Sequence, residues 1–189
     1  DLEVPLESSG AIVLPAGNLG NTAAFGKALR EAHALGLIDR MPRLVSVQAA
    51  GAAPFARSFR EGFATRYTVA AETIATAIRI GDPASWDRAV RAIRETDGLV
   101  LSCTDDEIIE AKVAIDVAGV GCEPASAASV AGVRQLVRSG VITRAHRVVA
   151  VLTGHVLKDP GMLVDLHQRD DFAQANRPIE IDADVRAVA

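Results

Sequence analysis

The stretch Leu14-Pro15-Ala16-Gly17-Asn18-Leu19-Gly20-Asn21 lies between an apolar run and an alanine-rich run with helical spacing. Residues 11–14 are typical of a short buried strand, and residues 22–35 predict a helix that ends near Gly36. A strand that leads through such a loop into a helix collects backbone N–H groups and the positive end of the helix dipole at one place. The loop therefore predicts a binding site for an anion, most often a phosphate. A tight turn with asparagine as the helix N-cap explains the same residues equally well.

Neither of the two common nucleotide-binding loops fits this stretch. The P-loop has four residues between its first glycine and Gly-Lys-Ser/Thr, but here five residues separate Gly20 from Gly26-Lys27, and Ala28 follows in place of a hydroxyl residue. The dinucleotide-binding fingerprint requires Gly-x-Gly-x-x-Gly, which residues 17–20 do not supply. A phosphorylated cofactor of another kind is indicated.

The composition excludes several classes of partner. Of the 189 residues, 49% are hydrophobic and only 4% are aromatic, as is usual in layered α/β proteins. The formal net charge of −4 provides no basic surface for nucleic acid, and no apolar run is long enough to span a membrane. Cys103 and Cys122 lack the spacing of metal ligands and fit reduced thiols, so we expect a cytoplasmic protein. We expect one domain over residues 1–175 and a tail over residues 176–189.

Strand-like and helix-like segments alternate along the chain. Buried strands are predicted at residues 11–14, 43–48, 98–103 and 147–152, and helices at residues 22–35, 54–62, 84–96 and 124–140, after Thr104 and near residues 163–167. Short connections between parallel strands require right-handed crossovers, which predicts a three-layer αβα fold with a mainly parallel sheet. Ligands in such folds bind beyond the carboxyl ends of the strands. Asn18, Asn21 and Thr153 all follow strands directly and can face one crevice.

An acidic cluster opens the helix that follows Thr104. Asp105, Asp106 and Glu107 occupy its first turn, where carboxylates compensate the helix dipole, and Thr104 is the expected N-cap. No histidine or further ligand lies nearby in the sequence, so we expect no metal site.

Five short motifs follow one another between residues 11 and 160. They are Gly17-Asn18-Leu19-Gly20-Asn21, Gln48-Ala49-Ala50-Gly51-Ala52-Ala53-Pro54, Ala75-Thr76-Ala77-Ile78-Arg79-Ile80-Gly81, Cys122-Glu123-Pro124-Ala125-Ser126-Ala127-Ala128 and Leu152-Thr153-Gly154-His155-Val156-Leu157-Lys158-Asp159-Pro160. Each alone is weak evidence. In this order they resemble the threonine synthase family, among the pyridoxal-phosphate enzymes of the tryptophan-synthase β-subunit type. The resemblance implies the large cofactor domain of fold-type II pyridoxal-phosphate enzymes.

The resemblance also implies roles for particular residues. The loop residues would hold the 5′-phosphate of pyridoxal phosphate through their N–H groups; they are Gly17, Asn18, Leu19, Gly20 and Asn21. Asn21 would also reach the phosphate of the substrate. Thr153 would place its hydroxyl beside the pyridine nitrogen, and Ala75 and Ala77 would line the cofactor ring. Residues 123–126 would border the same cavity, although a plain helix start explains them nearly as well.

The family converts O-phospho-L-homoserine and water into L-threonine and phosphate, and this chemistry needs a lysine that forms a Schiff base with the cofactor. The lysines of this chain are Lys27, Lys112 and Lys158, and none lies in the Ser-x-Lys-Asp context of the family. We therefore expect no catalytic residue in this chain. We expect it to be the C-terminal part of a threonine synthase, incomplete at the N-terminus, with a missing N-terminal half as its partner. The full-length protein is expected to form a homodimer.

Other functions stay open at this point. The same fold serves threonine or serine dehydratases and related lyases, whose loops are usually richer in glycine or threonine and which often have serine or cysteine at the position of Thr153. The chain could also be an inactive truncated product without catalysis. An independent nucleotide-binding module is poorly supported because both nucleotide loops fail.

Overall fold

A parallel sheet forms the centre of the molecule. The computed structural model describes residues 10–177, 179 and 181–183. In this part of the chain, four strands are arranged in the order β3-β2-β1-β4, and every neighbouring pair is parallel. The strands are β1 (Ala11–Pro15), β2 (Arg43–Ala49), β3 (Leu99–Cys103) and β4 (Val148–Ala150). β4 is shorter than the predicted strand at residues 147–152, because it pairs with β1 only opposite residues 11–13.

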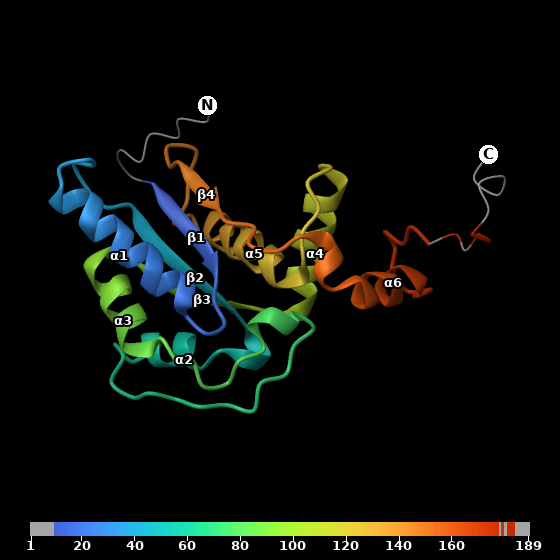
Figure 1. The fold of residues 1–189 in the computed structure, drawn as a ribbon, viewed down its shortest axis with the longest axis horizontal. Coiled ribbons are helices and arrows are strands. Elements are labelled where there is room, and N and C mark those ends of the chain that lie inside the picture. The colour runs from blue at the N-terminus through green and yellow to red at the C-terminus, as the bar shows by residue number, and fades with distance from the viewer. Residues whose placement is uncertain (1–9, 178, 180, 184–189) are drawn as a thin grey trace.

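Helices cover both faces of this sheet, as Figure 1 shows. On one face lie α1 (Gly20–Ala34), α2 (Pro54–Arg60) and α3 (Trp86–Glu95), and on the other lie α4 (Asp105–Val117) and α5 (Pro124–Arg138). Successive residues of β1 serve the two cores in turn, because side chains alternate between the faces of a strand. Ile12 and Leu14 pack with α1 and α3, whereas Val13 packs with α5. This arrangement confirms the predicted three-layer αβα fold.

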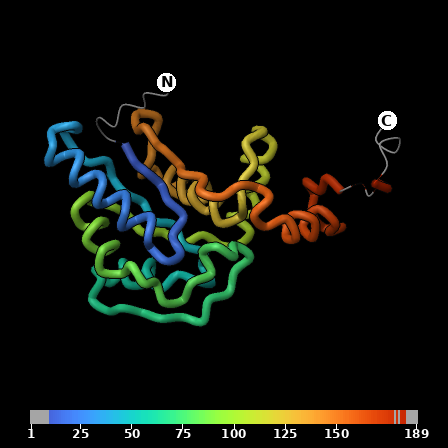
Figure 2. The backbone as a smooth tube through the Cα atoms, viewed as in Figure 1, coloured from blue at the N-terminus to red at the C-terminus, as the bar shows by residue number. Residues whose placement is uncertain are grey.

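A long connection between α2 and α3 reaches the carboxyl ends of the strands. Figure 2 shows it (green) running along one side of the molecule before the chain returns to the sheet. The N–H of Val69 donates to Gly81 O at 3.1 Å, and the N–H of Glu72 donates to Gly51 O at 3.0 Å. The connection contains η2 (Thr76–Ile78), a single 3₁₀ turn. A further 3₁₀ turn, η1 (Ala50–Ala52), lies between the end of β2 and the start of α2.

The remaining elements follow β4. They are η3 (Val156–Lys158) and α6 (Pro160–Gln168), which extends away from the sheet in Figure 1. α6 is longer than the predicted helix near residues 163–167, because Pro160 at its start is compatible with a first helical turn. Most of the predicted tail, residues 176–189, lies outside the described residues. Among the helices that the structure describes, none combines the length and the apolar character that a membrane span needs.

The acidic start of α4 is used locally. The N–H of Glu107 donates to Thr104 Oγ1 at 3.2 Å, and the Thr104 N–H donates to Glu107 Oε2 at 3.0 Å, so the predicted N-cap forms a complete capping box. Asp105 accepts hydrogen bonds from the Thr73 hydroxyl and the Ile74 N–H, which ties the α2–α3 connection to α4. The described residues contain no group of three or more potential metal ligands.

Candidate functional site

A cavity of about 260 Å³ lies beyond the carboxyl ends of β1 and β4. Four segments that are distant in the sequence form its wall: the loop after β1, η2, the start of α5 and the residues after β4. The lining residues are Pro15, Gly17, Asn18, Leu19, Gly20, Asn21, Ala77, Ile78, Glu123, Ala125, Thr153 and Lys158. Asn18, Asn21 and Thr153 thus reach one cavity, as their positions after strands indicated. What they bind is still a prediction at this point.

The loop after β1 is packed closely against η2. A Cβ atom on Gly17 would lie 2.8 Å from Ile78 Cα and 3.1 Å from Ala77 O, so a side chain at this position would collide with backbone. Leu19 has φ 63°, in the left-handed region that few non-glycine residues adopt, while its side chain is buried. Such a backbone turns successive N–H groups toward one point. The loop is therefore held in an unusual conformation by its packing.

The start of α1 leaves several N–H groups without helical partners. The first residue of this region whose N–H donates to a backbone carbonyl is Ala23, which bonds to Leu19 O at 3.0 Å. In the part of the chain that the structure describes, the N–H groups of residues 17–21 have no backbone acceptor. α1 has 15 residues and no acidic residue in its first turn. Its dipole and these N–H groups make the cavity favourable for an anion.

The asparagine N-cap interpretation is wrong. The N-cap is Leu19, which makes no side-chain cap bond. Asn18 Oδ1 instead accepts from the Ala84 N–H at 2.7 Å, and Asn18 O accepts from the Ser85 N–H at 3.2 Å. Asn18 is therefore occupied in holding the start of α3 against the loop. Asn21 is exposed in the first turn of α1, at the cavity.

Thr153 is held at the cavity by a buried serine. Ser126 is fully buried near the start of α5, and its Oγ accepts from the Thr153 N–H at 2.9 Å and from the Gly154 N–H at 2.8 Å. The Ser126 and Thr153 hydroxyl oxygens are 3.1 Å apart. Residues 123–126 were expected at the cavity border, but this role of Ser126 was not predicted from the sequence. No local pattern could have shown it, because the two residues are 27 positions apart.

A buried carboxylate faces the same turn. Glu123 is only 3% exposed, and its Oε2 lies 3.2 Å from the Nζ of Lys158 in the cavity wall. A Cβ atom on Gly154 would lie 2.1 Å from Glu123 Oε1, so the glycine leaves room for the carboxylate. The ion pair offsets part of the cost of burying a charge. This pair was not predicted from the sequence.

The two alanines expected at the cofactor ring differ in position. Ala77 lines the cavity. Ala75 is fully buried in the core cluster that contains α5 and lies outside the lining residues, so the expectation that it faces the cavity is not met. Ala77 and Ile78 of η2 reach the loop after β1, whereas Ala75 packs within this core cluster.

The other two lysines lie away from the cavity wall. Lys27 is exposed and pairs with Glu31 at 2.7 Å. Lys112 is only 1% exposed, and its Nζ donates to Asp116 Oδ2 at 2.7 Å and to Cys122 O at 2.8 Å. Lys112 therefore holds the turn that precedes Glu123.

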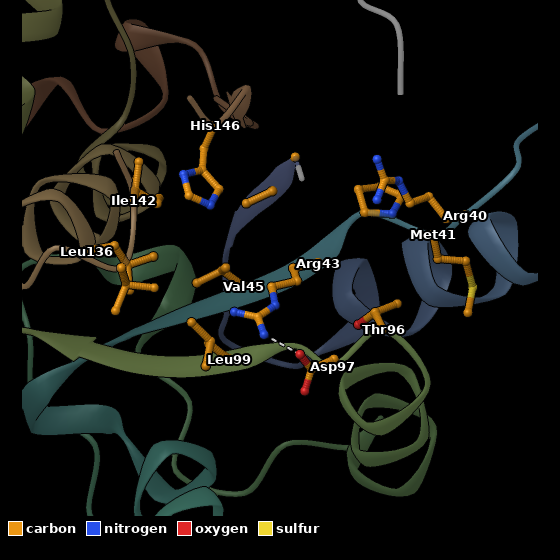
Figure 3. A pocket seen from close by; sticks show the side chains of 14 residues that line it. Arg40, Met41, Arg43, Val45, Thr96, Asp97, Leu99, Leu136, Ile142 and His146 are labelled. Carbon is orange, nitrogen blue, oxygen red and sulfur yellow. Dashed lines mark hydrogen bonds and ion pairs between the residues drawn. The ribbon is translucent and has the colours of Figure 1, made fainter. Parts of the chain in front are cut away.

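A larger cavity, of about 450 Å³, lies at the opposite end of the sheet. Figure 3 shows its wall, to which the apolar side chains of Val45, Leu99 and Ile142 contribute together with Arg43 and His146. The Arg43 guanidinium pairs with Asp97, and both side chains are largely exposed. No helix of the described chain begins at this cavity, because the strands enter it by their amino ends.

Comparison with known proteins identifies the family of this chain. Residues 3–154 match the sequence profile of a family described as "Pyridoxal-phosphate dependent enzyme". This chain belongs to the pyridoxal-phosphate dependent enzyme family. The matched residues include every residue that lines the smaller cavity except Lys158.

Several curated relatives within the pyridoxal-phosphate dependent family are threonine synthases. The chain is 46% identical over 167 residues to threonine synthase of Methanosarcina acetivorans, covering 87% of this chain and 41% of that protein. It is 49% identical over 148 residues to threonine synthase of Mycobacterium leprae, covering 78% of this chain and 39% of that protein. The chain thus spans about two fifths of the length of these relatives.

Solved structures show the same fold. Threonine synthase from Escherichia coli superimposes with a TM-score of 0.67 at 18% identity, covering 99% of this chain and 44% of that chain. Threonine deaminase isoform 2 from Solanum lycopersicum gives a TM-score of 0.62 at 21% identity, covering 79% of this chain and 41% of that chain. These likenesses confirm the predicted fold of fold-type II pyridoxal-phosphate enzymes.

Proposed function

We propose that this chain is the cofactor-binding part of a threonine synthase, which converts O-phospho-L-homoserine and water into L-threonine and phosphate. The observation that carries the proposal is one cavity, in a chain of this family, that joins the N–H-rich start of α1 to the Thr153 hydroxyl. The identity of 46% to 49% with threonine synthases supports this reaction over others of the family.

The residues of the cavity fit pyridoxal 5′-phosphate. The backbone N–H groups of residues 17–21 would bind its phosphate, since they have no backbone acceptor in the described chain and lie at the positive end of α1. The absence of a Cβ on Gly17 lets η2 close against this loop, so that Ala77 would lie against the ring. Thr153 would face the ring nitrogen. When bound, the cofactor supplies an electron sink that stabilises negative charge on substrate carbon atoms.

Asn21 is our candidate for the substrate phosphate. It lies in the first turn of α1, is exposed, and lines the cavity beside the cofactor phosphate loop. Its side-chain amide can donate two hydrogen bonds to an anion. We propose the same role for this residue as the sequence resemblance implies.

We propose further that the lysine which bonds covalently to the cofactor belongs to a part of the protein outside this chain. Lys27 and Lys112 lie away from the cavity wall, and Lys158 is engaged by the buried Glu123 carboxylate. The chain alone is then expected to have no turnover. We place the activity in the cytoplasm, which the two buried, free cysteines support.

The binding half of the proposal is tested with 4′-deoxypyridoxine 5′-phosphate, a cofactor analogue without the aldehyde, so that its binding needs no lysine. Isothermal titration calorimetry on the whole chain should show binding at least tenfold tighter than for unphosphorylated 4′-deoxypyridoxine, because charge-assisted bonds to the phosphate are lost in the latter. Equal affinity for the two compounds would contradict the proposed phosphate site.

The lysine is tested by reduction. The chain is incubated with pyridoxal phosphate, reduced with borohydride, and digested for peptide mass analysis. We expect only weak, scattered labelling. Specific stoichiometric labelling of Lys27, Lys112 or Lys158 would show that the chain carries its own Schiff-base lysine.

The reaction is tested by supplying the missing part. The chain is co-expressed with the segment of Methanosarcina acetivorans threonine synthase that precedes the matched region. Phosphate release from O-phospho-L-homoserine is expected, whereas the chain alone should release none. Ammonia release from L-threonine without phosphate release from phosphohomoserine would favour a dehydratase instead.

A further inference from the structure

The Ser126 hydroxyl has a fully determined set of hydrogen bonds. A serine hydroxyl can accept two hydrogen bonds and donate one. Both acceptor positions of Ser126 Oγ are used, by the N–H groups of Thr153 at 2.9 Å and Gly154 at 2.8 Å. Its one proton is therefore left for Thr153 Oγ1 at 3.1 Å. Although either hydroxyl could donate in an isolated pair, the two N–H groups decide that Ser126 is the donor.

The consequence is a direction for the Thr153 hydroxyl. Thr153 Oγ1 accepts from Ser126, so its own proton must point elsewhere. Within the described chain, no acceptor other than Ser126 Oγ lies within hydrogen-bond distance of this hydroxyl. Thr153 is exposed and lines the cavity, whereas Ser126 is fully buried behind it. The free proton is therefore available to an acceptor in the cavity.

We propose that Ser126 is a positioning residue that sets the Thr153 hydroxyl as a hydrogen-bond donor toward the ligand. Ser126 acts in two ways: its Oγ accepts from the backbone N–H groups of Thr153 and Gly154, and its proton is donated to the Thr153 hydroxyl. The hydrogen bonds of Ser126 with Thr153 and Gly154 are present in the structure without a ligand. The identity of the acceptor, a ring nitrogen of the cofactor, rests on the proposed function.

The protonation of a bound ring reports this direction. A donor at the ring nitrogen stabilises the unprotonated ring and opposes the pyridinium, whose N–H needs an acceptor. In Ser126→Ala, the Thr153 hydroxyl loses its donor and can turn to accept from the pyridinium. The pKa of the bound ring of 4′-deoxypyridoxine 5′-phosphate, followed by ultraviolet absorbance against pH, should rise by about one unit, a tenfold change in the protonation equilibrium.

Two further variants make the test specific. Ser129→Ala is the matched control, because Ser129 is also fully buried on α5 but donates only to Ser126 O, at 2.8 Å. It should leave the ring titration unchanged. Ser126→Cys keeps the size of the side chain with a weaker donor and should give an intermediate shift. In a Thr153→Val background, Ser126→Ala should cause no further shift, because the hydroxyl that Ser126 directs is gone.

A measurement without ligand separates this inference from the proposed function. Amide hydrogen exchange in the whole chain should be at least tenfold faster at Thr153 and Gly154 in Ser126→Ala than in the wild type, and unchanged in Ser129→Ala. If the analogue does not bind, the proposed function fails while exchange still tests the role of Ser126. If exchange at both amides, or the ring titration of a bound analogue, is the same in Ser126→Ala as in the wild type, the inference is wrong.

Discussion

The two ends of the sheet carry cavities of opposite character. The cavity at the carboxyl ends, about 260 Å³, is formed by the start of α1, a hydroxyl fixed by Ser126 and a buried carboxylate. The cavity at the amino ends, about 450 Å³, has an apolar floor and exposed, mutually paired charges. The larger cavity therefore has exposed charges that pair with each other, whereas the smaller has polar groups that are held in place by the buried Ser126 and Glu123 side chains. Convergent polar groups, more than volume, mark the candidate site.

The largest effect is expected at the buried Lys112 contact, which holds the turn before Glu123. Lys112→Ala leaves Cys122 O and Asp116 without their donor and should lower the free energy of unfolding by about 3 kcal/mol, because a buried pair is broken on one side. Lys27→Ala removes an ion pair of the same 2.7 Å length and helical spacing, but one that is exposed, and should cost at most about 0.5 kcal/mol. Urea denaturation followed by circular dichroism measures both. Equal losses of unfolding free energy in the two variants would show that the burial of the Lys112 contact adds nothing to its contribution.

The next largest effect comes from comparing two glycines of the loop after β1, one packed against η2 and one in open space. Gly17→Ala places a methyl group 2.8 Å from Ile78 Cα and should cost on the order of 1–3 kcal/mol in the free energy of unfolding, and at least tenfold in affinity for 4′-deoxypyridoxine 5′-phosphate. Gly20→Ala meets no atom within 4 Å and should leave the unfolding free energy unchanged. The two variants are compared by urea denaturation and calorimetry. A stable Gly17→Ala with unchanged affinity would refute the close packing of η2 on this loop.

The stability of the fold should also depend on pH, through two buried cysteines near the carboxyl ends of the strands. Burial raises the pKa of Cys103, the last residue of β3, to about 12, and that of Cys122, next to Glu123, to about 11. The unfolded chain releases these protons above pH 9 while the folded chain keeps them, so stability is full below pH 9 and falls as the pH rises toward 11 to 12. The expected loss at pH 10 is on the order of 1 kcal/mol for each thiol. Urea midpoints at pH 8 and pH 10 measure it.

The control for this pH effect is the double variant Cys103→Ala/Cys122→Ala, which should lose less stability between the two pH values than the wild type. Iodoacetamide should modify neither thiol of the folded chain at pH 8, because the reactive thiolate is scarce and buried. Rapid modification of either cysteine in the native protein would contradict the burial and the raised pKa of that thiol.

The smallest effect on stability is expected at the larger cavity, by the amino ends of the strands. Arg43→Ala removes the exposed pair with Asp97 and should change the free energy of unfolding by less than about 1 kcal/mol, with an even smaller change at high salt. Affinity for 4′-deoxypyridoxine 5′-phosphate should stay within twofold of the wild type, because Arg43 lies at the other cavity. A clear loss of affinity would mean that the larger cavity takes part in binding this ligand.

Local features were predictable from the sequence where neighbouring residues decide them. The capping box at Thr104 needs only residues 104–107, and the buried run at β1 is visible in its own composition. Asparagine as the N-cap of α1 was one of two interpretations of the loop, and it is wrong because the Asn18 side chain bonds to Ala84, which is 66 positions away. The family resemblance placed Ala75 at the ring, but Ala75 is fully buried in the core cluster that contains α5, which its neighbours in the sequence do not show.

The sequence by itself determined the alternation of strands and helices and the family, because the first depends on residues close together along the chain and the second on short motifs in a fixed order. Only the tertiary structure decided which groups share the cavity and how they are oriented. The Ser126–Thr153 contact joins residues 27 positions apart, and Glu123 and Lys158 are 35 positions apart. Such hydrogen bonds arise when α5 packs against the end of β4, and hydrogen-bond direction depends on every partner at once.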